Sequence, residues 1–546
     1  MKTLKKLFAL VATVATCLSL GATSVLAEGD STTTTTGSIT INNATGTYAI
    51  YQLFKGDVVE TTANNETTKT ISNAQWGDSW NEAAKKAAAE EGVDAAKAVE
   101  IVASYTTEDE ILDFAKIILA KNEQGQYVDM TGSNATATAT KAEGATSATA
   151  TFSNLPYGYY LIENTEVASG ESYTKYIFAV VGETAVVINN KTDVPSMTKK
   201  VQDTNDSVAD STTGWQDSAD YDIGDAVPFQ LTGTVASTYD NYKTYYFAFH
   251  DEEEKGLTFN QESVNVYVDT NKNGTQDEGE TSLTKGTDYT VTYTAATESA
   301  GDKFDITFSD LKKVNGVEGG SKIVVEYTST LNTSANIGSQ GNVNKAKLEF
   351  SNNPNEEQSG PDKPGTGETP WDNVIVFTYQ TVVNKVDQDK NALKGAKFTL
   401  SKVKVGTDGK ATEEVVKTFE YSEKDNTDTT VFTFKGLDDG TYVLKETETP
   451  AGYNTCDPIE FTVTAEHDVE WTTKDRTAVL TKLNDGDKTF VGTVSTGTVT
   501  TSVVNKKGSV LPSTGGIGTT IFYVTGAILM LGAGVLLLSR RNSTSK

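Results

Sequence analysis

Val431-Phe432-Thr433-Phe434 is the stretch that decides the fold, because four consecutive β-branched and aromatic residues favour a β-strand. Comparable short stretches occur on both sides of it, at Val382-Val383, Phe398-Thr399-Leu400 and Ser502-Val503-Val504. Many short strands separated by turn-forming residues predict a β-sandwich for this part of the chain.

The same pattern extends toward the N-terminus, and the chain is too long for a single hydrophobic core. We expect a mainly β protein of tandem immunoglobulin-like sandwiches, with domains at residues 28–193, 194–360 and 371–507. A polar, proline-bearing segment marks the boundary before the third domain, where we expect a linker at 361–370.

The first domain contains a departure from the β pattern. It opens with alternation at Ser38-Ile39-Thr40-Ile41, which predicts a strand. Between Trp76 and Lys121, alanine-rich stretches with apolar residues three and four apart predict one or two inserted helices.

Both ends of the chain carry targeting signals. Residues 1–27 combine a basic start, a short apolar run and the small-residue spacing Val25-Leu26-Ala27, which predicts a signal peptide. Residues 508–546 hold Leu511-Pro512-Ser513-Thr514-Gly515, then an apolar run long enough to cross a bilayer, then basic residues. This order resembles the LPxTG sorting signal of sortase substrates, and the resemblance implies cleavage between Thr514 and Gly515.

Composition excludes several function classes. A net charge of −28 repels nucleic acid and anionic lipid. Cys17 leaves with the signal peptide, so Cys456 has no internal disulfide partner. His250 and His467 are the two histidines, which argues against histidine triads and multi-histidine zinc sites.

Three further stretches carry a family resemblance. Asn384-Lys385-Val386-Asp387, residues 393–398 (LKGAKF) and residues 442–453 (YVLKETETPAGY) resemble the collagen-adhesin B-type (Cna B) domain, whose E-box is the last stretch. Residues 155–163 (LPYGYYLIE) carry the likeness more weakly into the first domain. With the sorting signal, the chain resembles the isopeptide-forming major pilins of Gram-positive bacteria.

That resemblance implies an intramolecular amide in the third domain. In such domains a lysine on the first strand condenses with an asparagine on the last strand while a carboxyl group assists. The matching residues are Lys385, Asn505 and the E-box Glu446. The site must be buried, because desolvation favours both the neutral amine and the neutral acid.

The middle domain has no E-box and resembles the A-type domains, in which aspartate replaces glutamate. Lys199 and Lys200 compete as its lysine, and strand alternation favours Lys199 as the inward residue. Asn344 is preferred over Asn342, and Asp251 best matches the carboxylate.

In the first domain, Ile39 to Ile41 occupy the strand where a lysine would be needed. We therefore expect no amide at Glu163, although Lys55 on a neighbouring strand is an alternative partner.

The loop from Asp269 to Glu280 has oxygen donors at EF-hand spacing, with glycine at position six. No cofactor is required by the sequence, and calcium is the one candidate, on Asp269, Asn271, Asn273, Thr275, Asp277 and Glu280. The alternative is a turn rich in Asn, Gly and Asp. Val264 to Val268 before it predict a strand and not the helix of a true EF-hand.

The function expected is a structural pilus subunit on the cell surface, anchored to the cell wall, and not an enzyme. Its expected partners are sortase, other copies of itself, minor pilins, peptidoglycan and host surface ligands. Lys191, in the linker after the first domain, is expected to receive the sortase-bound threonine, with Lys200 as the runner-up. A single-copy wall-anchored adhesin is the alternative, since it would share the same signals.

Overall fold

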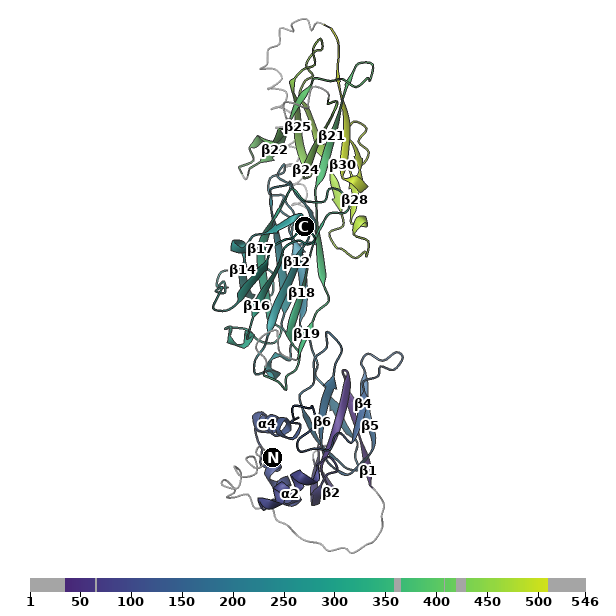
Figure 1. Ribbon diagram of the computed structural model, residues 1–546, viewed down its shortest axis with the longest axis vertical. Coiled ribbons are helices and arrows are strands. Elements are labelled where there is room, and N and C mark those ends of the chain that lie inside the picture. Colours follow the sequence, from purple (N-terminus) through teal and green to yellow (C-terminus); the bar gives the residue numbers. More distant parts are fainter. Residues whose placement is uncertain (1–34, 64–65, 358–364, 407, 419–428, 509–546) are drawn as a thin grey trace.

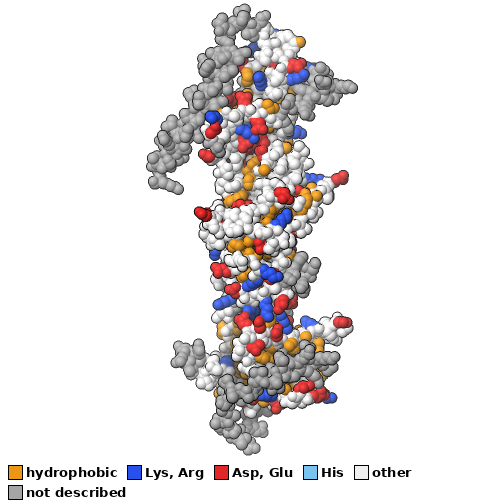
Figure 2. Space-filling view, turned by 90° about the vertical axis from the view of Figure 1, so that its left-hand side faces the viewer, with side chains coloured by type: hydrophobic (Ala, Val, Ile, Leu, Met, Phe, Trp, Pro, Cys, Tyr) orange, Lys and Arg blue, Asp and Glu red, His pale blue; other side chains and the backbone are white. Residues whose placement is uncertain are grey.

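The computed structural model describes residues 35–63, 66–357, 365–406, 408–418 and 429–508. Three β-rich parts follow one another along the long axis of an elongated molecule (Figure 1). Acidic and basic side chains are interspersed along the visible face (Figure 2). The predicted signal peptide and the sorting signal lie outside the described residues. Within the described ranges, no helix is long and apolar enough to span a membrane.

The first part consists of two sheets that enclose buried isoleucines, among them Ile39 and Ile41. One sheet has the order β5-β1-β8, and the other β3-β2-β6-β7 with β4 against β2. The strands are β1 (Thr36–Asn42), β2 (Thr47–Ala63), β3 (Glu66–Trp76), β4 (Ala135–Thr138), β5 (Thr149–Pro156), β6 (Gly158–Glu166), β7 (Ile177–Val181) and β8 (Val186–Asn189).

The helical insertion lies where the sequence predicts it, but it contains three short helices and not one or two. They are α2 (Glu82–Glu90), α3 (Ala95–Ala103) and α4 (Glu108–Ile118). Gly92, at a φ of 74°, ends the first, and Asp94 caps the second by accepting from Lys97 N–H. Thr107 and Glu110 form a capping box at the third. These local stop and start signals divide the insertion.

The middle part is a sandwich of two sheets around a large aromatic and aliphatic core. One sheet has the order β10-β20-β18-β12-β16-β15 with β19 against β18, and the other β13-β17-β11-β9 with β14 against β17. The strands are β9 (Ser196–Val201), β10 (Ser218–Asp220), β11 (Ala226–Thr234), β12 (Phe247–Glu253), β13 (Leu257–Phe259), β14 (Asn265–Asp269), β15 (Thr290–Thr294), β16 (Lys303–Phe308), β17 (Lys322–Leu331), β18 (Asn342–Ser351), β19 (Thr366–Glu368) and β20 (Asp372–Phe377).

The third part is a smaller sandwich. Its sheets have the orders β24-β21-β30-β29 and β23-β22-β25-β26, with a separate pair β27-β28. The strands are β21 (Tyr379–Asp387), β22 (Lys397–Val405), β23 (Ala411–Thr418), β24 (Val431–Leu437), β25 (Gly440–Glu448), β26 (Ile459–Val463), β27 (Ala465–His467), β28 (Leu480–Leu483), β29 (Val491–Thr493) and β30 (Thr498–Asn505). The first strand β21 and the last strand β30 are parallel neighbours.

Strand β20 joins the middle and third parts. It pairs with β18 of the middle sheet, and its Val374 and Val376 lie in the middle core, whereas Ile375 and Phe377 lie in the third. Strand β19 falls inside the expected linker 361–370, and β20 falls inside the expected third domain, yet both extend the middle sheet. Alternating side chains let one strand serve two cores. The joint between the two sandwiches is therefore a packed interface.

Candidate functional site

Lys385, Glu446 and Asn505 meet inside the third sandwich. Lys385 lies on β21 and Asn505 on the adjacent strand β30, while Glu446 reaches them from β25 in the opposite sheet. The Lys385 ammonium donates to Asn505 Oδ1 and lies 3.3 Å from Glu446 Oε1. Asn505 Nδ2 donates to both Glu446 oxygens, at 3.0 and 3.1 Å. The three groups required for an amide exchange are therefore in mutual contact.

This cluster is buried between the two sheets. The side chains of Lys385 and Glu446 have no exposed surface, and the Phe398 ring lies 5.8 Å from Lys385 Nζ. Burial lowers the pKa of Lys385, which favours the neutral amine. The backbone N–H of Cys456 donates to Glu446 Oε2 at 2.9 Å and fixes the orientation of that carboxyl group. A neutral amine beside an amide carbonyl oxygen can act as a nucleophile.

A second cluster lies between the two sheets of the middle sandwich. Lys199 on β9 is fully buried, and its Nζ lies 2.5 Å from Asp251 Oδ2 on β12 and 2.7 Å from the Tyr327 hydroxyl on β17. Asn344 on β18 donates from Nδ2 to the Tyr327 hydroxyl at 2.9 Å. The structure thus brings Lys199, Asp251 and Asn344 together around Tyr327. Burial lowers the pKa of Lys199 and raises that of Asp251.

Two residues of this cluster were not anticipated from the sequence. Tyr327 contacts all three expected residues, and Glu253 accepts from Asn344 Nδ2 at 3.2 Å. Glu253 stands directly opposite Asn344 in the β12/β18 pairing. Strand alternation was the available signal, because Glu253 is two residues from Asp251 and so lies on the same face.

Among the described residues no lysine forms an ion pair or hydrogen bond with Glu163, although the charge of Lys121 is near enough to act on it. Its carboxylate accepts from the Tyr51 hydroxyl at 2.7 Å, and Tyr51 in turn lies 2.6 Å from the Tyr127 hydroxyl. Lys55, the alternative partner, instead pairs with Asp78 at the surface. Ile39 and Ile41 fill the equivalent strand as core residues.

The two expected linkage lysines differ in their surroundings. Lys191 is exposed and lines a surface pocket of about 200 Å³ together with Thr174, Tyr242 and Pro354. Lys200 is half-buried, and its Nζ lies 2.6 Å from Asp217 Oδ1. Lys191 is therefore the more accessible amine, while residues 511–515 lie outside the described residues.

The loop expected to bind calcium follows strand β14, in agreement with the strand expected there. Asp269 accepts backbone N–H groups from Asn273 and Gly274, and Glu280 accepts from Thr270 and Asp277. Backbone donation lowers the pKa of Glu280. Asn271 and Asn273 both point their Nδ2 groups at Asp277. To bind a cation through oxygen, the side-chain amides of Asn271 and Asn273 must rotate so that their Oδ1 atoms replace their Nδ2 groups. The Thr275 hydroxyl donates to Asn273 Oδ1.

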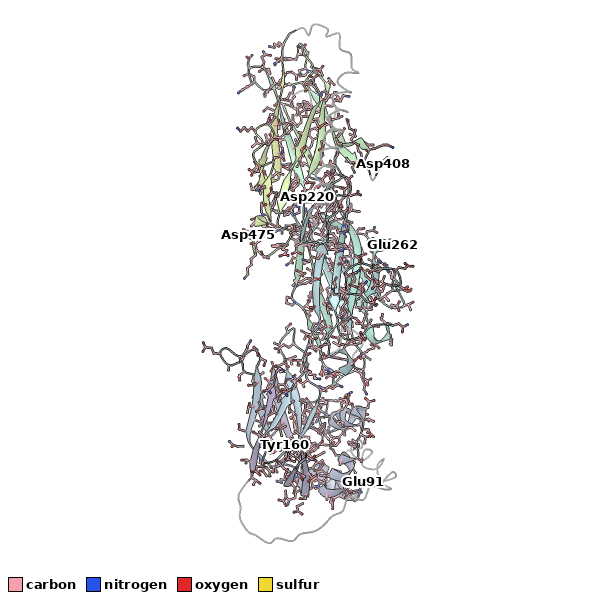
Figure 3. All side chains as sticks on the ribbon, turned by 180° about the vertical axis from the view of Figure 1, so that it is seen from behind. Glu91, Tyr160, Asp220, Glu262, Asp408 and Asp475 are labelled. Carbon is pink, nitrogen blue, oxygen red and sulfur yellow. The ribbon has the colours of Figure 1, made fainter. Side chains whose placement is uncertain are left out.

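A third polar cluster, also not anticipated, lies at the joint between the middle and third sandwiches. Lys402 on β22 is fully buried and contacts Asp222 at 2.7 Å and Asp438 at 2.9 Å. Next to it, Asp220 approaches Asp438 and Asp439, and also lies 3.8 Å from His467 Nε2. Asp220 is seen at this junction in Figure 3. No asparagine side chain contacts Lys402 in the described part of the chain, so this cluster differs from the other two.

Comparison with known proteins relates two parts of the chain to described families. Residues 380–477 match the prealbumin-like fold domain (SpaA), and residues 503–544 match the LPXTG cell wall anchor motif. The trypsin-resistant surface T6 protein of Streptococcus pyogenes serotype M6 is 26% identical over 429 residues, covering 68% of this chain and 72% of that protein.

Solved structures to which the chain is similar include the T6 backbone pilin of S. pyogenes (18% identity, TM-score 0.49, covering 89% of this chain and all of that one). Another is the major pilin SpaD of Corynebacterium diphtheriae (19% identity, TM-score 0.47, covering 87% and 98%). The matched anchor motif makes this chain a secreted surface protein attached to the cell wall.

Proposed function

We propose that the chain is the repeating structural subunit of a covalently polymerised pilus, stabilised by two internal lysine–asparagine amides. The matches to the prealbumin-like SpaA domain, to the LPXTG anchor motif and to a streptococcal surface protein support this proposal. It would have three domains in tandem, with the boundary between the second and third domains after β20 and not at the expected linker 361–370.

The observation that carries the proposal is the contact between Lys385, Glu446 and Asn505 in a domain that precedes a sorting signal. Neutral Lys385 attacks the side-chain carbonyl carbon of Asn505, and the amide nitrogen leaves as ammonia. Glu446 accepts the proton of the amine and passes a proton to the leaving nitrogen, since it contacts both atoms. An amide then replaces the disulfide that this chain cannot form.

Polymerisation uses a second amide chemistry, between subunits. Sortase cleaves between Thr514 and Gly515 and holds the threonine as a thioester, which the amine of Lys191 in the next copy resolves. The exposure of Lys191 and its position after the first domain support this assignment. Peptidoglycan supplies the amine for the last subunit, and minor pilins and host surface ligands are further partners.

Immunoblotting of cell-wall extracts tests the function. A ladder of bands that survives boiling in detergent is expected for a covalent polymer. A single band at the size of one chain would reject the polymer in favour of a single-copy adhesin.

A further inference from the structure

Two carboxyl groups, not one, lie in the middle-domain cluster. Asp251 and Glu253 are both buried and point from β12 to the same side. Asp251 contacts the amine of Lys199, whereas Glu253 contacts the amide nitrogen of Asn344. Within the described part of the chain, Asp251 makes no hydrogen bond to Asn344. In the third domain, by contrast, Glu446 contacts both reacting nitrogens.

We propose that Asp251 and Glu253 divide the acid and base roles in the middle domain, with Glu253 as the catalytic acid that protonates the leaving nitrogen of Asn344. This inference rests on the proposed function, because it concerns how the Lys199–Asn344 amide forms. It goes beyond the expected lysine, asparagine and aspartate by assigning a second carboxyl group to the reaction.

The proton balance follows from the contacts. The neutral amine of Lys199 attacks Cγ of Asn344, so that a new C–N bond forms and the bond from Cγ to Nδ2 breaks. One proton passes from Nζ to the Asp251 carboxylate, and one passes from the Glu253 carboxylic acid to Nδ2, which leaves as ammonia. The site ends with a neutral Asp251, an ionised Glu253 and the amide, so its net charge is unchanged.

Hydrogen bonds hold Glu253 in this position. Ser329 Oγ donates to Glu253 Oε1 at 2.5 Å, and this oxygen lies 3.2 Å from Asn344 Nδ2, so a proton on Oε1 reaches the leaving nitrogen. Glu253 Oε2 has no hydrogen-bond partner in the described part of the chain. Tyr327 donates to Asp251 Oδ2 at 2.8 Å and accepts from Asn344 Nδ2, and so aligns the amide between the two acids.

The electrostatic surroundings favour the protonated form of Glu253. Burial and the neighbouring charge of Asp251 raise the pKa of Glu253 to about 8, so it holds its proton at neutral pH. The titratable groups that face it are Lys199, Asp251, Tyr293, Asp302 and Tyr327. Of these only Lys199 is a basic group, and burial lowers its pKa, which favours the neutral amine that the attack requires.

The test follows amide formation in the full ectodomain during cell-free synthesis, by quantifying the cross-linked tryptic peptide that contains Lys199 and Asn344. Glu253→Gln keeps the size of the side chain but removes the proton, and the rate should fall on the order of 100-fold. The matched control is Glu252→Gln on the outer face of β12, where Glu252 pairs with Lys303 and Lys345. The Lys385–Asn505 peptide in the same molecules reports whether the chain has folded.

The outcomes separate the two claims. If the wild-type chain yields no Lys199–Asn344 peptide, the amide proposed for this domain is absent. If the wild type forms it and Glu253→Gln forms it equally fast, the role of Glu253 is overturned. In a pH series, the wild-type rate should fall above about pH 8, where Glu253 loses its proton, and Glu253→Gln should not show this fall. The same fall in Glu253→Gln would contradict the acid role.

Discussion

The Lys402 side chain of the third domain lies 2.7 Å from the Asp222 carboxylate of the middle domain, in an ion pair with almost no exposed surface. Asp438 also accepts from Lys402, and the Tyr442 hydroxyl donates to Asp222 at 3.2 Å. Burial opposes the charge on Lys402, but attraction to Asp438 and Asp222 raises its pKa above the usual range. Lys402 therefore stays an ammonium ion, unlike Lys199 and Lys385, and stabilises the joint as an ion pair.

Replacing Lys402 with methionine should destabilise this joint by about 3 to 5 kcal/mol, because the substitution leaves two buried carboxylates without their cation. Urea denaturation of the ectodomain, followed by tryptophan fluorescence, to which Trp471 beside the joint contributes, measures the change. The control is Lys482→Met, which removes an exposed pair with Glu466 in the same domain and should cost less than about 1 kcal/mol. Equal effects of the two variants would refute the special role of the joint pair.

The stability of the joint should decrease as pH rises from 5 to 9.5. Burial together with the charges of Asp220 and Asp203 raises the pKa of Asp439 to about 8, so folding favours its protonated form and that advantage is lost as pH rises toward 8. Burial alone would lower the pKa of His467, but hydrogen bonds to Asp203 and Asp220 raise it to about 10. The stabilisation that protonated His467 gives the folded state is complete below the ordinary histidine pKa and is lost as pH rises through about 10.

Both groups thus act in the same direction. Calorimetry of the ectodomain should show a Tm for the middle and third domains that falls with increasing pH, and Asp439→Asn should flatten the curve. A Tm that rises over this range would contradict the raised pKa values of Asp439 and His467.

Replacing Glu446 with alanine should leave the third domain folded but without its amide. The intact mass of the wild-type protein should be lower than the mass calculated from its sequence by one ammonia for each amide. The mass of the Glu446→Ala variant should fall short of its calculated mass by one ammonia less than in the wild type. Loss of the cross-link between Lys385 and Asn505, which lie 120 residues apart, should cost about 5 kcal/mol in stability. Glu448→Ala, on an exposed side chain of the same strand, is the control and should keep the wild-type mass.

Replacing Lys191 with arginine should abolish the polymer ladder in cell-wall extracts while leaving single chains attached to the wall. Arginine keeps the charge but is not a nucleophile at neutral pH. Lys200→Arg is the matched control and should assemble normally. If Lys200→Arg lost the ladder and Lys191→Arg kept it, the assignment of the linkage lysine would be reversed. Tandem mass spectrometry of the polymer should find Thr514 joined to Lys191.

Calcium titration of the full ectodomain by calorimetry tests the loop from Asp269 to Glu280. Binding should release heat in the wild type and be lost in Asp277→Asn, since Asp277 is the carboxylate to which both asparagine amides point. Asp288→Asn, outside the loop, should bind as the wild type does. If the wild type releases no heat, the loop does not bind calcium and is a turn stabilised by its own hydrogen bonds.

The sequence predicted the features that depend on neighbouring residues, and it did not predict those that depend on contacts between residues far apart in the chain. Strand alternation is local, so it indicated the mainly β fold and the inward side of Lys199. The joint depends on residues far apart in the chain, such as Asp222 and Lys402, and no local pattern relates them. The polar, proline-bearing segment places β20 in the third domain, but apolar residues on both faces of this strand fit either core, and only the pairing with β18 shows where it lies.

Each proposed amide connects the first strand of a sandwich to a strand late in the same sandwich, β9 to β18 in the middle domain and β21 to β30 in the third, and this determines where a pulling force travels. In a stretched polymer, tension would enter at Lys191, run to Lys199, cross the first amide to Asn344, continue through β20 to Lys385, cross the second amide to Asn505, and leave at Thr514. The long segments between each cross-linked pair would carry no load and could not be extended. The first sandwich lies on the N-terminal side of Lys191 and therefore outside this path, so it would bear no tension and would need no cross-link of its own.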